Sequence, residues 1–558
     1  MRPRWRLLMQ VDADAGIGPA NAPGGILTHP ATASLLADRR CLVPSGCCRD
    51  RCIQTGGSLC CPGIKPDSRR FVKTRRSANQ RDVNPMTTPT RSLPSAPNDA
   101  ALAELWGLGG GEPGALDRVV LTGADPVLPS SFRIGTAAQA SIAAAGLAAA
   151  ELHRQRGGRA QCVSVDMRHA AIEFRSERYL RVNGTAPASF WDPLAGLYTA
   201  GGGRQVRLHT NFPHHRAAVL QLLGCPPVRK GVQRQLLSWN AVAFETAVAE
   251  QGGVVAAMRS REEWDAHPQA QALASVPVLQ IEKIGDAPPR PLRSGPRPLS
   301  GVRVLDLTRI IAGPVAGRAL AAHGAEVMLI SSPQLPFVDW LVKDTGRGKL
   351  SAFLDLKTPQ GRARLAELVS QADVFLQAYR PGALDALGLA PSQIAALRPG
   401  IIYGSLCAYG AVGPWAARRG FDSLVQTASG FNQAEGDAAG VDGGKELPCQ
   451  ALDHATGYLL AFGAMMARAR QAREGGSFLV RVSLAATGRW IWQLGRVAHG
   501  LAQTDPGLDD VQDLLQTEAS GFGELRGVRH AAMLSDTPAA WDRPAVALGT
   551  HPPEWPAH

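Results

Sequence analysis

The sequence has no uninterrupted apolar run of the roughly 18 residues that a membrane-spanning helix requires. Its most apolar stretch, residues 137–150, is broken by Gln139 and Ser141 and is typical of a buried helix in a globular protein. A hydrophobic fraction of 45% and a charged fraction of 19% are ordinary for a soluble chain that buries its own cores. We therefore predict a cytoplasmic protein without a membrane segment.

Motifs of several nucleotide-dependent and hydrolytic enzymes are missing as well. No G-x-G-x-x-G follows the strand expected over residues 302–307, which argues against a dinucleotide-dependent dehydrogenase. Neither the phosphate-binding loop G-x4-G-K-[ST] nor the nucleophile elbow G-x-S-x-G occurs. The sequence thus excludes three common enzyme classes.

Basic residues are concentrated near the start of the chain. Residues 1–85 contain 14 Lys and Arg against six Asp and no Glu, so they carry +8 of the net +12 and leave +4 for the other 473 residues. The rest of the chain is therefore nearly balanced in charge. No stretch interleaves aromatic residues with Lys and Arg as a groove for single-stranded nucleic acid does. We expect no nucleic-acid partner.

Cysteines are sparse beyond residue 85, where they occur singly, as in a reduced intracellular enzyme. These four are Cys162, Cys225, Cys407 and Cys449. The other six lie within residues 41–61 and lack the regular pairing of zinc ligands. A histidine group has no carboxylate at ligand spacing, so we interpret its members as surface or loop residues and predict no metal site: His209, His214 and His215.

Residues 1–85 differ from the remainder in composition. The apolar segment at residues 7–9 is too short for a signal peptide, and no amphipathic pattern surrounds the early cysteines. We predict that residues 1–85 are a disordered or non-native extension, with Met86 as the natural start.

Strand and helix patterns alternate between residues 299 and 410. Strands are expected over residues 302–307, 326–330, 350–356, 374–379 and 401–407. Thr358 and Pro359 have the residue types of a helix cap and first helical position. The alternation predicts an α/β fold with a Rossmann-like, doubly wound parallel sheet that binds ligands at its strand carboxyl ends.

A second, smaller α+β domain is expected at about residues 185–285, before a proline-rich linker at residues 288–298. The glycine-rich segment from Gly201 to Arg204 predicts a hairpin turn within it. An internal repeat is also suggested, because residues 133–166 and 452–484 share the order helix, Gly-Gly, strand. In that register Thr136 falls opposite Asp453.

Residues 300–330, "SGVRVLDLTRIIAGPVAGRALAAHGAEVMLI", resemble the opening of the family III CoA-transferases, which include formyl-CoA and carnitine CoA-transferases. The similarity continues to residues 451–470, "ALDHATGYLLAFGAMMARAR", where the family's catalytic aspartate falls on Asp453. It is strongest over residues 298–490, with a degenerate partial copy over residues 130–290. The implied organisation is a degenerate lobe at 100–290, a core at 298–500 and a return segment at 501–558.

The resemblance implies transfer of CoA from an acyl-CoA to a carboxylic acid through an aspartyl anhydride and an aspartyl-CoA thioester. Asp453 would be the nucleophile, and backbone N–H groups at its helix start would stabilise both the carboxylate and an oxyanion. The implied CoA contacts are Ile311, Ala312, Leu354, Asp355, Leu356, Lys357, Tyr379, Arg380 and Tyr409. CoA and acyl-CoA would be substrates, with no permanently bound cofactor.

Family III enzymes form interlocked dimers, so a homodimer is a further implication. We also expect the small domain to fold over Asp453 in the same chain, with the loop at residues 201–216 near that carboxylate. The sequence departs from the formyl-CoA transferases at positions that argue against formyl-CoA specificity and against some CoA contacts: Ile311, Ser331, Ser332, Ala386 and Cys407.

Three alternatives remain at the level of the sequence. Asp453 could be an ordinary helix N-cap. The chain could be an α-methylacyl-CoA racemase of the same fold, although Phe421 replaces the histidine of the racemase motif and His454 is a poorly oriented substitute. It could also be an inactive subunit that binds CoA esters.

Overall fold

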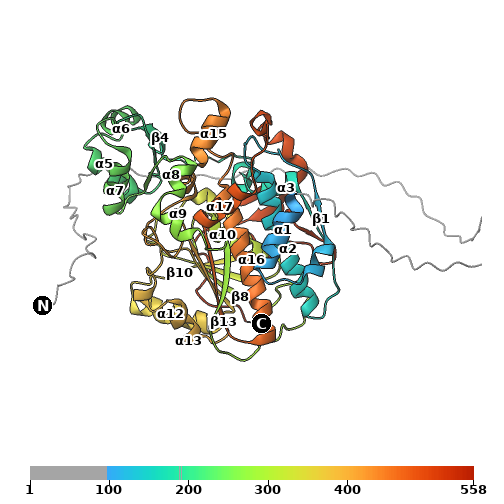
Figure 1. The fold of residues 1–558 in the computed structure, drawn as a ribbon. Coiled ribbons are helices and arrows are strands. Elements are labelled where there is room, and N and C mark those ends of the chain that lie inside the picture. The colour runs from blue at the N-terminus through green and yellow to red at the C-terminus, as the bar shows by residue number, and fades with distance from the viewer. Residues whose placement is uncertain (1–96, 188, 190, 558) are drawn as a thin grey trace, which may run out of the picture. The chain divides into compact units, whose positions relative to one another are not determined.

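The computed structural model describes residues 97–187, 189 and 191–557. The predictions for residues 1–85 therefore lie outside the described residues. The largest element is a seven-stranded sheet (Figure 1). Its strands lie in the order β10 (Lys349–Phe353), β9 (Glu326–Ser331), β8 (Arg303–Leu307), β11 (Val374–Gln377), β12 (Ile402–Cys407), β13 (Ser477–Ser483) and β7 (Leu279–Gly285).

The sheet is mostly parallel, which agrees with the predicted α/β class. Six strands run parallel, but β7 pairs antiparallel with β13, so the expectation of a wholly parallel sheet is wrong at this edge. The difference arises because β7 comes from the segment before the proline-rich linker, within the range expected for the small domain. An antiparallel edge strand needs no crossover helix to join the sheet.

Helices cover both faces of this sheet, which explains why its strands are almost continuously apolar. On one face, α12 (Pro359–Ser370) and α13 (Pro391–Leu397) pack with Leu305 and Phe375. On the other face, α10 (Ala312–Ala322) and α16 (Ala451–Glu474) enclose Val304 and Val480. The predicted cap of α12 is present, because the Gly361 N–H donates to Thr358 Oγ1 at 3.0 Å.

The long helix α2 (Ile134–Gln155) packs along α16, and α1 (Pro97–Leu108) covers α2 (Figure 1). Beside α2 lies a three-stranded sheet with the order β1 (Val119–Thr122), β2 (Val163–Asp166) and β16 (Met533–Leu534). α3 (Met167–Glu173) follows β2 directly, capped by Asp166, which accepts the His169 N–H at 3.0 Å. The chain segments before and after the large sheet are thus packed together.

A smaller lobe contains an antiparallel sheet and three helices with their own apolar core (Figure 1). These are β4 (Gly196–Thr199), β5 (Gln205–Leu208), β6 (Val255–Ala257), α5 (Pro213–Leu223), α6 (Arg229–Leu236) and α7 (Ala241–Glu250). The predicted turn after Gly201 does connect two antiparallel strands, with positive φ at Gly202 and Gly203, the backbone region that favours glycine.

Shorter elements complete the described part of the chain. A third small sheet has the order β14 (Leu515–Ser520), β15 (Gly523–Val528) and β3 (Arg181–Val182). The remaining α-helices are α4 (Ser176–Tyr179), α8 (Arg261–Asp265), α9 (Pro268–Leu273), α11 (Asp339–Thr345), α14 (Asp422–Ala428), α15 (Phe431–Ala439) and α17 (Leu484–Gln493). Within residues 97–557, apart from 188 and 190, no helix combines the length and apolarity of a membrane span.

Candidate active site

Asp453 lies in the first turn of α16, but it does not cap the helix. The N-cap is Gln450, and the Asp453 side chain is 7% exposed. No described residue donates a hydrogen bond to its carboxylate. The interpretation of Asp453 as an ordinary N-cap is therefore wrong, and its burial without a donor requires another explanation.

A second aspartate occupies the helix start instead. The Asp453 N–H donates to Asp422 Oδ2 at 2.9 Å, and the Leu452 N–H also favours the charged form of Asp422. The sequence-based idea that these N–H groups stabilise the Asp453 carboxylate is therefore wrong. They stabilise the charged form of the neighbouring Asp422, which leaves Asp453 the carboxylate of the pair with fewer hydrogen-bond donors.

The surroundings of Asp453 strongly favour its protonated form. Burial raises the pKa of Asp453 well above its usual range, and the carboxylates of Asp422 and Glu177 raise it further. Burial also raises the pKa of Asp422 to about 6, although the bound N–H groups oppose that shift. When ionised, Asp453 is thus a poorly stabilised and correspondingly reactive carboxylate.

His454 points away from Asp453. Its Nε2 lies 3.2 Å from Glu177 Oε2, and its ring stacks on Phe174 with centroids 5.4 Å apart. It lines neither of the two cavities at Asp453. His454 is therefore not placed as a second acid or base opposite Asp453.

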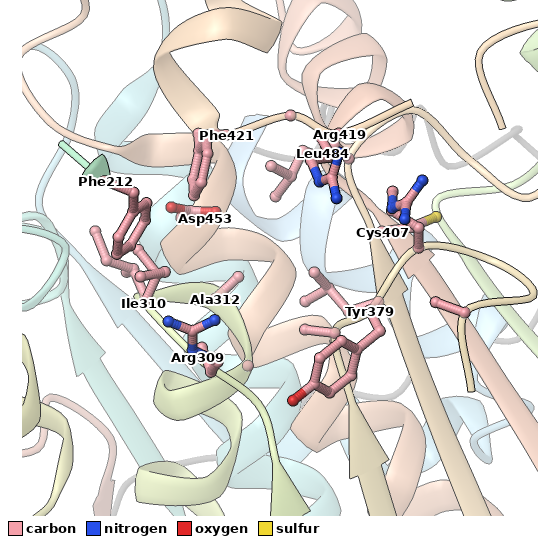
Figure 2. Close-up of a pocket in the computed structure, with 18 of the residues that line it drawn as sticks. Phe212, Arg309, Ile310, Ala312, Tyr379, Cys407, Arg419, Phe421, Asp453 and Leu484 are labelled. Carbon is pink, nitrogen blue, oxygen red and sulfur yellow. The ribbon is translucent and has the colours of Figure 1, made fainter. Parts of the chain in front are cut away.

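The first cavity at Asp453, here called the arginine cavity, has a volume of about 340 Å³. It opens where β8, β11 and β12 end, and Figure 2 shows the Asp453 carboxylate between the rings of Phe212 and Phe421. Four arginines contribute to its wall: Arg309, Arg380, Arg418 and Arg419. The sequence predicted a ligand site at these strand ends, and a cavity is present there.

Three of the four guanidinium groups lack a carboxylate partner. Arg418 lies 3.7 Å from Glu245 Oε1, whereas no described carboxylate lies within 4.0 Å of Arg309, Arg380 or Arg419. Arg309 instead donates to the Pro336 carbonyl, and Arg419 donates to the Gly252 carbonyl. The arginine cavity therefore presents unneutralised positive charge, which suits an anionic ligand.

The second cavity, here called the acidic cavity, has a volume of about 370 Å³ and shares Phe212, Ile310, Ile311, Phe421 and Asp453 with the first. Its other lining residues are Glu177, Arg178, Trp191, His209, Asn211, Val338, Leu341, Asp422, Ser423 and Gln450. Three carboxyl groups thus line it against one guanidinium. Asp453 is accessible from both cavities.

The turn between β8 and α10 separates the two cavities. Ile310, a β-branched residue, has a φ of 75°, which costs on the order of 1–3 kcal/mol. This conformation places Arg309 in the arginine cavity and Ile310 and Ile311 in both. Strain of this kind persists only where the surrounding packing fixes it, and it commonly marks a functional turn.

The small lobe contributes directly to the site. His209, Asn211 and Phe212 line the acidic cavity, which confirms that part of the 201–216 loop lies near Asp453 within one chain. The His209 ring stacks on Phe421 with centroids 4.0 Å apart and an interplanar angle of 4°. Phe421, which replaces the racemase histidine, is thus a wall between the cavities and has no acid or base function.

The interpretation of the histidine group as surface or loop residues agrees with the exposed His214 and with His209, which lies in a loop, but it is wrong for His215, which is buried on α5. His209 and His215 are buried, because the aromatic side chains Phe212 and Phe421 pack on their rings. Burial lowers the pKa of each to about 3, so both rings are neutral. Neither ring nitrogen of His215 has a hydrogen-bond partner among the described residues.

The residues expected to bind CoA divide into two groups. Ile311, Ala312, Tyr379 and Arg380 line the arginine cavity. The others line neither cavity: Leu354, Asp355, Leu356, Lys357 and Tyr409. Of these, Leu354 belongs to an apolar core, Lys357 is exposed, and Tyr409 is buried against Trp415.

Arg309 and Arg419 were not predicted from the sequence as site residues. Arg309 precedes the strained turn, and Arg419 comes from a loop with no recognisable motif. The one available signal for Arg309 was its position two residues after the end of a parallel strand.

The start of α2 resembles the start of α16, as the proposed repeat requires. The N-cap residues Arg133 and Gln450 have nearly the same backbone angles, φ −77° with ψ 62° and 63°. Asp125 accepts the Thr136 N–H at 3.0 Å, as Asp422 accepts that of Asp453. The Thr136 hydroxyl also donates to Asp125 at 2.6 Å. Position 136, which corresponds to Asp453 in the proposed repeat, therefore has a hydroxyl group in place of a carboxylate.

The comparison with protein-family models identifies one family. Residues 118–290 and 299–549 match the family model described as CoA-transferase family III. The probable fatty acyl-CoA transferase Rv3272 of Mycobacterium tuberculosis is 33% identical over 208 residues, which are 35% of this chain and 52% of that protein. The acetyl-coenzyme A transferase nodX of Hypoxylon pulicicidum is 27% identical over 388 residues, 61% of this chain and 65% of that protein.

A mammalian relative, the succinyl-CoA:glutarate CoA-transferase of Mus musculus, is 38% identical over 184 residues, 31% of this chain and 41% of that protein. The chain thus spans less than two thirds of the length of these relatives. The crystal structure of Rv3272 aligns with a TM-score of 0.33 and 33% identity, covering 36% of this chain and 59% of that chain.

Proposed function

The chain belongs to CoA-transferase family III, and from this premise we propose that it moves CoA from an acyl-CoA to a carboxylic acid. Asp453 is the proposed acyl acceptor. The observation that carries the proposal is the position of its carboxylate, which is accessible from two cavities and receives no hydrogen bond from a described residue.

The proposed reaction needs only one carboxylate that can be acylated. Attack of the Asp453 carboxylate on the thioester carbonyl breaks the C–S bond, releasing CoA thiolate and forming a mixed anhydride. The thiolate then attacks the aspartyl carbonyl, giving an aspartyl-CoA thioester and the free donor acid. The acceptor carboxylate attacks the carbonyl of this thioester, which releases CoA thiolate and forms an anhydride between Asp453 and the acceptor. The thiolate then attacks the acceptor carbonyl of that anhydride, giving the new acyl-CoA and restoring the Asp453 carboxylate.

The arginine cavity is the proposed site of CoA. Three guanidinium groups without carboxylate partners suit its phosphates, and they offer a replacement for the family contacts missing at Ser332, Ala386 and Cys407. The order of the six parallel strands, with β8 and β11 at the centre, supports a Rossmann-like sheet with a ligand at the switch in strand order.

The racemase alternative finds less support. It needs two proton-transfer groups on opposite faces of the substrate α-carbon. Phe421 cannot carry a proton, and His454 is turned towards Glu177. A homodimer remains a proposal taken from the family.

Incubation with an acyl-CoA followed by hydroxylamine should yield a protein-bound aspartyl hydroxamate in amounts approaching one per chain. Hydroxylamine attacks the aspartyl carbonyl of the anhydride or thioester and displaces the donor acid or CoA, and mass spectrometry of the peptide containing residue 453 should locate the resulting hydroxamate. The yield should fall as the pH decreases through the raised pKa of Asp453, because only the ionised carboxylate is nucleophilic. A protein that binds acyl-CoA without reacting would give no protein-bound hydroxamate at residue 453 at any pH, although free acyl-CoA itself reacts with hydroxylamine.

Replacing Arg419 by glutamine should raise KM for the acyl-CoA roughly 10-fold with little change in kcat, since a phosphate contact contributes about equally in the ground and transition states. The wild-type KM should also increase with ionic strength more steeply than that of the variant. Steady-state kinetics at two salt concentrations measure both effects. Arg216→Gln is the matched control, because Arg216 already faces Asp192 in the small lobe. Equal KM values for wild type and Arg419→Gln would exclude this contact.

A further inference from the structure

The lining of the acidic cavity indicates which class of carboxylic acid the protein would use as a substrate. Resting on the proposed function, we infer that the acidic cavity binds the acyl group and selects apolar monocarboxylic acids over dicarboxylic acids. The two cavities meet at Asp453, so a thioester whose CoA lies in the arginine cavity extends its acyl chain into the other.

The charge of the acidic cavity disfavours a second substrate carboxylate. Glu177, Asp422 and Asp453 line it, and the only lining cation among the described residues is Arg178. The Arg178 Nε lies 3.9 Å from Glu177 Oε1, so this guanidinium already faces a carboxylate. A substrate with a terminal carboxylate would therefore add a fourth acidic group to a site with one cation.

Much of the remaining lining of the acidic cavity is apolar. Leu341 lies on α11, and Val338 is the residue directly before that helix. Ile310, Phe212 and Phe421 line both cavities and so form the boundary with the arginine cavity. These side chains suit an aliphatic or aromatic acyl chain, whose burial is favourable at about 25 cal/mol per Å² of apolar surface. A carboxylate there would exchange its hydration for the few polar groups of the lining, among which Arg178 is the one cation of the described residues.

The arginine cavity does not provide an alternative site for that second carboxylate. Its unpaired guanidinium groups lie on the CoA side of the turn at Ile310, and Arg309 and Arg419 do not line the acidic cavity. The turn and the stacked pair of His209 and Phe421 thus divide the site into a cationic part for CoA and an apolar, acidic part for the acyl group.

The test compares hexanoate with adipate, which have the same number of carbons and differ by the terminal carboxylate. With one acyl-CoA donor, kcat/KM for hexanoate as acceptor should exceed that for adipate at least about 30-fold at pH 8. Binding of hexanoyl-CoA and adipoyl-CoA, followed by tryptophan fluorescence, should show a preference in the same direction. Comparable values for the two acids in both assays would overturn the inference.

A charge inserted into the apolar wall should change the selectivity. Val338 is only partly buried, so Val338→Arg can extend a guanidinium into the cavity, and Val338→Gln is a matched control of similar polarity without charge. The arginine variant should gain at least about 10-fold in the adipate-to-hexanoate ratio of kcat/KM, and the glutamine variant should not. Equal ratios in the two variants would contradict the placement of the acyl group.

The same measurements separate this inference from the reaction itself. Absence of transfer to either acid, together with tighter binding of hexanoyl-CoA, would remove the proposed reaction and support the selectivity. Transfer to adipate that is lost in Arg178→Gln would support the reaction and overturn the selectivity, because Arg178 would then bind the second carboxylate.

Discussion

Asp453→Asn should lower kcat/KM for CoA transfer by at least about 10³-fold, because an amide cannot form the anhydride on which the reaction depends. The substitution is nearly isosteric, and the N–H of residue 453 can still donate to Asp422. The fold and the binding of acyl-CoA should therefore persist. Transfer rates measured together with acyl-CoA affinity test this expectation.

Asp437→Asn is a suitable control, since this aspartate is exposed on α15 and lines neither cavity. Its activity should match the wild type. Full activity in Asp453→Asn would place the nucleophile elsewhere, and Asp422 would become the first candidate. Loss of acyl-CoA binding together with activity would instead indicate that Asp453 is needed to maintain the cavity.

Asp344→Ala should reduce the free energy of unfolding by about 3–5 kcal/mol, the usual effect of removing one partner from a buried ion pair. Asp344 accepts hydrogen bonds from Arg318 Nη1 at 2.7 Å and Arg347 Nη2 at 3.2 Å. The side chains of all three residues are 1% exposed. The alanine variant would leave two buried guanidinium groups without this common carboxylate.

The electrostatics of Asp344 support that expectation. Burial by itself would raise the pKa of Asp344, but the two guanidinium groups hold it below its usual value. The Ser176 hydroxyl also donates to Asp344 at 2.7 Å, which ties α11 to α4. Because α11 carries Leu341 of the acidic cavity, the variant should lose substrate selectivity as well as stability.

Urea denaturation of wild type and variant measures the expected loss. Asp339→Ala provides the control within the same helix, because Asp339 is exposed and pairs only with Lys343 four residues away. That change should cost less than about 1 kcal/mol. A loss in Asp344→Ala no larger than in Asp339→Ala would mean that the buried network contributes little to the fold.

The strands of the large sheet were predictable because local patterns encode them. Strands buried on both faces are continuously apolar, and the helices between them have recognisable ends, such as the cap at Thr358. The antiparallel strand β7 was not predicted, because pairing direction depends on where the chain enters the sheet. Its sequence alone does not carry that information.

The site was only partly predictable for a related reason. Ile311, Ala312, Tyr379 and Arg380 follow strand ends and were expected at the ligand site, where they line the arginine cavity. Arg419 and His215 come from segments far apart in the chain and carry no motif. Packing of the small lobe against the loop after β12 brings them to the same cavity.

The sequence by itself determined the family and the α/β class, since both depend on residue types at fixed local spacing, and the family resemblance then selected Asp453 as the candidate nucleophile. Only the tertiary structure decided that Asp422, rather than Asp453, accepts N–H groups at the start of α16. It also decided that Asp453 adjoins one cavity rich in arginine and another rich in carboxyl groups. The reason is physical: burial, charge pairing and cavity shape arise from contacts between distant segments, and no local pattern records them.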